Sequence, residues 1–316
     1  ISAFIGNNGA GKSNIIELIT EVFSEAKNAT HNSNAAVGEP DIINCNIDYE
    51  YNGVDYSLNY DNFEVNVYLN KKPISKKDLN TVLPETIMLY YAGETERQLE
   101  RANATIDVRY DNVLKKSKEM DFPGFKFLDY YSTNDLGLLL IVAAIYKGEY
   151  YKKLLQLLNC SEILMENTLV ITNPKRKGNG EADSYWGARG FVKNFLDELK
   201  KYAARTKDIG ENYVMAFNDV SLWKKTSENE AALFTKLKAL KNAGYISFFS
   251  VSLKRNDENT FIHEYLSEGE KQLALLYLLT NFTAKNNCLY LFDEFDSYLH
   301  LNWQRSISQM LNEVNV

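Results

Sequence analysis

The spacing of apolar residues changes sharply near the start of the chain. A short apolar run ends at Ile5, and after the polar, glycine-rich segment 6–14 apolar residues recur at Ile16, Ile19 and Val22. A short apolar run is typical of a buried strand, whereas a spacing of three to four residues puts side chains on one face of a helix. The pattern predicts a strand, a loop and a helix with one buried face.

Polar and apolar residues alternate between positions 41 and 72, which is typical of strands with one buried face. The pair Asn52-Gly53 in this stretch is a strong signal for a tight hairpin turn. A further strand is predicted to end at 91–93, and a second hairpin is predicted within 245–266, with its turn at 256–259. We therefore expect antiparallel strands in these two parts of the chain.

The segment 110–244 is predicted to be mainly helical. Its run 136–146 is apolar almost throughout and fits a buried helix, and 227–244 has a cap at Ser227 and a stop at Gly244. No heptad pattern persists, which argues against a long coiled-coil arm. The segment is expected to form a compact helical lobe.

The composition describes a globular chain, because 45% of its 316 residues are hydrophobic and 24% are charged. No apolar run reaches the roughly 18 residues that span a bilayer, so no membrane segment is expected. The net charge of −7 argues against a broadly basic surface for nucleic acid, although a local basic groove stays possible. Three widely spaced cysteines favour a reducing cytoplasm. The chain starts with Ile rather than Met, so we expect it to be part of a longer protein.

The strongest chemical signal is "GNNGAGKS" at 6–13, which fits the phosphate-loop pattern G-x-x-x-x-G-K-[ST]. Glycines let backbone N–H groups wrap around phosphate oxygens, and the amino end of the next helix favours an anion. Lys12 would reach the β- and γ-phosphates, and Ser13 would ligate Mg²⁺. A chance glycine turn is the alternative, which the strand–helix context disfavours. The residues expected to contact the nucleotide here are Asn8, Gly9, Ala10, Gly11, Lys12, Ser13 and Asn14.

A second signal lies near the other end of the chain, where the apolar run 288–292 leads into Asp293 and Glu294. Adjacent carboxylates at the carboxyl end of a buried strand lie where an α/β sheet places its ligand chemistry. Asp293 would hold Mg²⁺, and Glu294 could act as general base on the attacking water. An ordinary strand that ends in a solvated acidic turn is the alternative.

A third signal is "LSEGEKQ" at 266–272, which opens an otherwise apolar helix. Gly269 is unexpected in the first turn of a helix, because Gly costs about 1 kcal/mol against Ala there. The order of the three signals resembles the ABC superfamily of ATPases, whose Leu-Ser-x-Gly-(Gln/Glu) signature precedes the acidic strand. The resemblance implies that Ser267, Glu268 and Gly269 face the γ-phosphate of an ATP bound to a second protomer. Ser267 and Glu270 also fit a plain capping box, and the two interpretations are compatible.

The stretch "DEFDSYLH" at 293–300 resembles the non-transporter branch of this superfamily, which includes RecF-like and OLD-like ATPases. His300 stands where transporters carry the Asp of the D-loop, which makes it a candidate catalytic residue. Gln98 is a candidate for the Q-loop and hence for the metal site. Phe295 and Leu301 replace the usual prolines. The family also carries a switch histidine after the next strand, and we expect that position to lie beyond Val316, where the given sequence ends.

The loop 173–190 combines four basic residues with Tyr185 and Trp186. Basic residues beside aromatic rings can hold a strand of nucleic acid. A solvated, mobile loop is the alternative.

Taken together, these features predict an α/β fold: a P-loop ABC-ATPase head with a mixed sheet, an antiparallel β-subdomain and an inserted helical lobe. The expected divisions are 1–109 for the phosphate-loop lobe with its β-subdomain, 110–244 for the helical lobe, and 245–316 for the signature helix and acidic strand. The cofactors implied are ATP and Mg²⁺.

Two further stretches, "YYAGETER" at 90–97 and "STNDLGLLLIVAAIY" at 132–146, resemble ATPases of bacterial anti-phage and restriction-associated systems. The PtuA-like ATPases of Septu-type, retron-linked defence are an example. This resemblance implies a cytoplasmic homodimer, or a higher oligomer, that closes on ATP and regulates an HNH-type nuclease partner. DNA or reverse-transcribed DNA is a possible further partner. The alternatives are a RecF-like DNA repair ATPase and a nucleotide-sensing scaffold that hydrolyses little ATP. No nuclease motif is evident in the chain itself.

Overall fold

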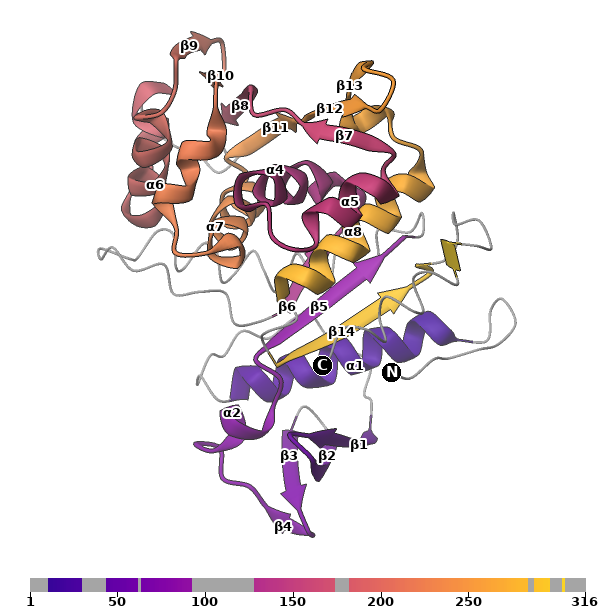
Figure 1. The fold of residues 1–316 in the computed structure, drawn as a ribbon. Coiled ribbons are helices and arrows are strands. Elements are labelled where there is room, and N and C mark those ends of the chain that lie inside the picture. Colours follow the sequence, from indigo (N-terminus) through magenta and orange to yellow (C-terminus); the bar gives the residue numbers. More distant parts are fainter. Residues whose placement is uncertain are drawn as a thin grey trace.

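The computed structural model describes residues 11–29, 44–61, 64–92, 128–173, 182–283, 287–295 and 303–304. Within these residues the strands form separate sheets, one of them parallel and the others antiparallel. Figure 1 shows the parallel sheet in the middle of the molecule, with the helices α4, α5, α7 and α8 on one side and α1 on the other. The chain is therefore of the mixed α/β class that its sequence predicts.

The parallel sheet has the strand order β14-β5-β6. Five of the six residues of β5 are buried, as expected for a strand that helices cover on both faces. Helix α1 contacts both β5 and β14. The bounds are Lys12–Ala29 for α1, Thr86–Tyr91 for β5, Leu128–Tyr131 for β6 and Cys288–Asp293 for β14.

The alternating stretch near the amino end forms the antiparallel sheet β1-β2-β3-β4, as predicted. Strands β1 and β2 pair from Cys45↔Tyr60 to Tyr51↔Val54, which leaves Asn52 and Gly53 as the turn. Both turn residues have positive φ, the requirement of a type I′ hairpin turn. The bounds are Cys45–Tyr51 for β1, Val54–Asp61 for β2, Glu64–Leu69 for β3 and Lys72–Pro73 for β4, and the short helix α2 (Leu79–Val82) follows.

The segment 110–244 holds more strand than its sequence predicts. Helices are prominent among its described residues, but β8 and β10 pair with each other and with β11 and β9 in the antiparallel order β11-β8-β10-β9. The strands were missed because each is short and lies in a part of the chain where helices are prominent. The helices are α4 (Leu136–Tyr146), α5 (Tyr151–Leu157), α6 (Gly190–Lys200) and α7 (Glu230–Asn242), and the strands are β7 (Cys160–Ile163), β8 (Asn167–Thr172), β9 (Arg205–Ile209) and β10 (Asn212–Phe217).

The predicted second hairpin is present as β12 and β13, and the Arg255 N–H donates to the Asn259 carbonyl across its turn at 2.8 Å. Its first strand is divided, however, because the chain passes from one sheet to another at Val251. The upstream part, β11, pairs with β8, whereas β12 pairs with β7 and β13. The bounds are Ile246–Ser250 for β11, Ser252–Arg255 for β12 and Thr260–Ile262 for β13, and α8 (Glu268–Thr283) follows.

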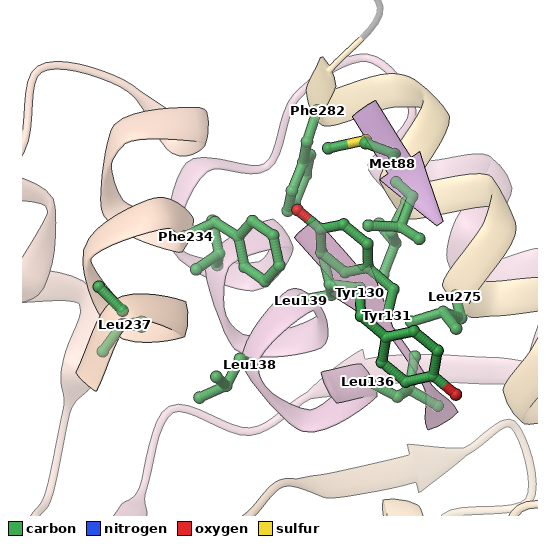
Figure 2. Packing of buried hydrophobic residues seen from close by; sticks show 14 of the residues in the cluster. Met88, Tyr130, Tyr131, Leu136, Leu138, Leu139, Phe234, Leu237, Leu275 and Phe282 are labelled. Carbon is green, nitrogen blue, oxygen red and sulfur yellow. The ribbon is translucent and has the colours of Figure 1, made fainter. Parts of the chain in front are cut away.

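The core is centred on α4, whose residues are all buried except Tyr146. Helices α7 and α8 both pack against α4. Figure 2 shows Leu138 and Leu139 of α4 in one buried cluster with Phe234 of α7, Leu275 of α8 and Met88 of β5. A helix that is apolar on every side requires this all-round cover. None of the described helices is both long enough and apolar enough to cross a membrane.

Candidate functional site

The amino end of α1 carries the last part of the predicted phosphate loop. Gly11 has a φ of +81°, in the left-handed region that favours glycine, and its carbonyl accepts the first helical hydrogen bond from Ile15 N–H at 3.2 Å. Lys12 and Ser13 then open the helix with half-buried side chains, and Asn14 is exposed. Their N–H groups lie in the first turn, the part of a helix whose dipole favours an anion. Asn8, Gly9 and Ala10 lie outside the described residues.

The contacts of α1 show which way it runs along the parallel sheet. Phe23, in the second half of α1, packs edge-on against Tyr49, with 5.3 Å between ring centroids. The Tyr49 hydroxyl donates to the Val82 carbonyl at 3.0 Å, and Val82 lies just before β5 begins at Thr86. The second half of α1 therefore lies at the amino end of β5.

Lys12 must then lie at the opposite, carboxyl edge of the sheet. Phe23 comes eleven positions after Lys12, a rise of about 16 Å along the helix axis, which is close to the length of a six-residue strand. Figure 1 shows α1 extending along β5 and β14. The start of α1 and the end of β14 thus meet at one edge.

The predicted carboxylates lie at this same edge. Strand β14 ends at Asp293, which is only 5% exposed, and the Asp293 carbonyl accepts a hydrogen bond from Ala92 N–H at the end of β5 (3.2 Å). Glu294 follows with an exposed side chain and a φ of +51°. A left-handed backbone turns the chain sharply, so the adjacent carboxylates have different surroundings, one buried and one open to solvent.

The predicted signature segment, residues 266–270, forms a complete capping box at the start of α8. The Glu270 carboxylate accepts hydrogen bonds from both the N–H and the hydroxyl of Ser267, each at 2.9 Å. The Glu270 N–H donates to the Ser267 hydroxyl oxygen at 3.3 Å. The plain N-cap interpretation is therefore correct as local structure. Ser267 and Glu268 are exposed, whereas Gly269 is buried.

A buried glutamine joins the start of α8 to the edge that carries the carboxylates. The Gln272 side-chain amide donates to the Phe295 carbonyl, directly after Glu294. Gln272 is 1% exposed, and its other amide atom, Oε1, has no hydrogen-bond partner among the described residues. The first turns of α8 therefore lie beside the loop that follows β14. Sequence reasoning missed Gln272, because a glutamine at a helix start is common.

An ion cluster at the end of β6 was also missed. Asp135 is buried, and its carboxylate pairs with Lys238 at 2.7 Å and with Lys241 at 2.6 Å, both from α7. Lys238 also donates to the Tyr130 carbonyl of β6 at 2.8 Å. Burial by itself would raise the pKa of Asp135, but the two lysines outweigh it and lower that pKa to about 2. Nothing local in the sequence pairs Asp135 with lysines about a hundred residues away.

The proposed nucleic-acid loop needs a correction. Tyr185 is fully buried and Trp186 is 8% exposed, so neither ring can stack on a base. Tyr185 instead packs edge-on against Tyr213 of β10, with ring centroids 5.7 Å apart. The two aromatics belong to the core, and basic residues 175–177 lie outside the described residues. Gln98 and His300 also lie outside them, so their predicted roles stay predictions.

Comparison with known proteins agrees with this arrangement. A family model for the RecF/RecN/SMC N-terminal domain matches residues 1–315, almost the whole chain. No curated protein matches the chain. The chain belongs to the RecF/RecN/SMC N-terminal domain family, whose members are P-loop ATPases that bind ATP.

Proposed function

We propose that this chain is an ABC-type ATPase head that holds the phosphates of ATP between the start of α1 and the end of β14. One observation carries the proposal: Gly11, Lys12 and Ser13 lie at the same edge of the parallel sheet as Asp293 and Glu294. The hydrogen-bond donors at the start of α1 favour an anion, and they lie beside two carboxylates. One carboxylate can bind a hydrated cation, and the other can take a proton from water.

Each of these residues then has a distinct role. The first N–H groups of α1 and the Lys12 ammonium bind phosphate oxygens. The Ser13 hydroxyl and the buried Asp293 carboxylate are hard oxygen donors, which fit Mg²⁺. Mg²⁺, when bound, would neutralise charge on the phosphates. The exposed Glu294 carboxylate accepts a proton from the attacking water.

The start of α8 would supply the other half of the ATP site to a second copy of the chain. Ser267 is exposed at the amino end of a sixteen-residue helix, and the Gln272 contact holds this end next to the loop after β14. A helix start that is open to solvent can receive a phosphate held by another protomer. Two heads would thus enclose two ATP molecules.

The wider task we propose is regulation of a partner nuclease of the HNH type in a Septu-type, PtuA-like defence system. It is supported by the resemblance of "YYAGETER" at 90–97 and "STNDLGLLLIVAAIY" at 132–146 to ATPases of that group. A RecF-like DNA repair ATPase is the second candidate, which the family match favours. A nuclease that co-purifies with the full-length protein and responds to its ATP state would support the first candidate. DNA-stimulated ATP turnover without a nuclease would support the second.

The phosphate-binding part is tested with Lys12→Ala. Loss of the ammonium should abolish ATP binding in a titration with Mg-ATP, because no other side chain described at the start of α1 carries positive charge. Lys76→Ala is the matched control, since it removes the same charge from an exposed position before α2 and should leave the affinity unchanged. Undiminished ATP affinity of Lys12→Ala would contradict the proposed site.

A further inference from the structure

The signature segment carries two carboxylates where an incoming phosphate would meet them. Glu268 and Glu270 both lie in the first turn of α8, beside Ser267. Acidic residues at this position stabilise a helix through its dipole. The same charges repel the γ-phosphate of an ATP molecule held by another protomer. Helix stability and phosphate binding thus make opposite demands on this turn.

The structure shows a cation from the same chain on each of these carboxylates. Lys271 Nζ lies 2.6 Å from Glu268 Oε1, and Arg255 reaches Glu270 Oε1 with both terminal nitrogens at 3.2 Å. The other oxygen of Glu270, Oε2, accepts both hydrogen bonds from Ser267. A single carboxylate therefore joins Arg255 to the serine that would meet the phosphate.

Arg255 has two further contacts besides Glu270. Its guanidinium donates to the Leu158 carbonyl and stacks over the Phe261 ring, 4.6 Å from the centroid. The Arg255 side chain is 26% exposed and that of Glu270 is 17% exposed, so water screens this pair less than a surface pair. An arginine fixed in this way cannot easily leave the carboxylate.

From this geometry we propose that Arg255 is a positioning residue of the composite ATP site. It cancels the charge of Glu270 and fixes the capping box, so that the amino end of α8 can receive a phosphate held by the second protomer. Lys271 does the same for Glu268 at a more exposed position. The proposal rests on the ATP-bridged dimer proposed above, and it extends that site to a residue on the β12–β13 hairpin.

The test is a double-mutant cycle between Arg255 and Glu270 in the full-length protein. Glu270→Gln keeps the capping box, because Gln serves at this position as Glu does, but it removes the charge. Light scattering would give the Mg-ATP concentration at which half of each variant dimerises. Arg255→Gln should raise that concentration about tenfold or more, the scale of one uncompensated charge near a phosphate at a protein surface.

The decisive result is the double variant. If charge is the cause, Arg255→Gln combined with Glu270→Gln should dimerise at the wild-type ATP concentration, because no unpaired carboxylate remains. If Arg255 acts only through Leu158 and Phe261, the defect should persist in the double variant, and the proposal is overturned. Lys254→Gln is the control, since Lys254 pairs with exposed Glu258 on the same hairpin and should change nothing.

Two further results keep the proposal separate from folding and from the proposed function. If Arg255→Gln does not fold, Lys271→Gln replaces it. A rise in the ATP concentration at which half of this variant dimerises would support the charge argument. An unchanged concentration would contradict it. Wild-type protein that binds ATP without ever dimerising contradicts the composite site, and this inference falls with it. If the wild-type protein dimerises but the double variant still needs more ATP than wild type, the role of Arg255 is contradicted and the proposed ATP site is not.

Discussion

At the scale of single residues, the buried ion pairs of Asp135 are expected to stabilise the folded chain. Its side chain is 2% exposed and that of Lys238 is 5% exposed, so each charge is buried and relies on the other. Removing one partner of a buried pair leaves an uncompensated charge. Asp135→Asn should therefore lower the free energy of unfolding by about 3–5 kcal/mol. Denaturant titration measures this, and Glu258→Gln, which breaks an exposed pair, should cost no more than about 1 kcal/mol. Equal losses in the two variants would show that the cluster is not a stabilising feature.

The same residue predicts how stability depends on pH. The pKa of Asp135 is lowered to about 2 in the folded chain, against about 3.9 for an unfolded aspartate. The folded state therefore binds the proton less readily than the unfolded state, and the contribution of Asp135 is complete above about pH 4. It should be lost as the pH falls from about 4 towards 2. Unfolding curves of wild type and Asp135→Asn should converge over this range.

Residues that act through a local pattern could be predicted from sequence, and those that act through distant contacts could not. Lys12, Ser13 and the pair Asp293-Glu294 follow from motifs whose flanking strands and helices are visible in the sequence. Lys238 meets Asp135 only because α7 packs on α4. The prediction that Tyr185 contacts nucleic acid was wrong for the same reason. Its loop is mostly polar in sequence, but the side chain packs against Tyr213 in the core.

At the scale of elements, the link between α8 and the loop after β14 is the feature most open to test. The Gln272 amide holds the Phe295 carbonyl, next to the proposed general base Glu294. Gln272→Met keeps the volume and removes the hydrogen bond, which is worth about 1 kcal/mol. We expect ATP affinity to persist and turnover to fall about five- to tenfold, because the loop loses its support.

Asn281→Leu is the matched control for this variant. The Asn281 amide also donates to a backbone carbonyl, that of Tyr277 at 2.7 Å, but it lies near the other end of α8. Steady-state ATP hydrolysis should be unchanged in this variant. A similar fall in both variants would mean that any weakening of α8 slows turnover, and the proposed support of the loop would be wrong.

Strands and helices could be predicted wherever apolar residues recur at one regular spacing. The alternation of 41–72 and the Asn52-Gly53 turn predicted the antiparallel sheet correctly, because each face of those strands has one environment. The strands β8 and β10 were hidden within a region of helices. The division of one predicted strand into β11 and β12 depends on pairing with β8 and β7, which no local pattern reveals.

At the scale of the whole molecule, both parts of the proposed ATP site lie at one end of the parallel sheet. The start of α1 and the end of β14 would bind the head's own ATP, whereas the exposed start of α8 would face that of a second head. A single head would thus offer half of each of two proposed sites. ATP should therefore act as the bridge between two copies, and its hydrolysis should separate them.

The most direct test is the solution mass of full-length Glu294→Gln protein by light scattering, with and without Mg-ATP. This change keeps the size of the side chain and removes the proposed base, so bound ATP should persist. We expect a mass that doubles only when Mg-ATP is present, and that stays unchanged when Lys12→Ala is added. A mass that does not change although ATP binds would contradict the composite site.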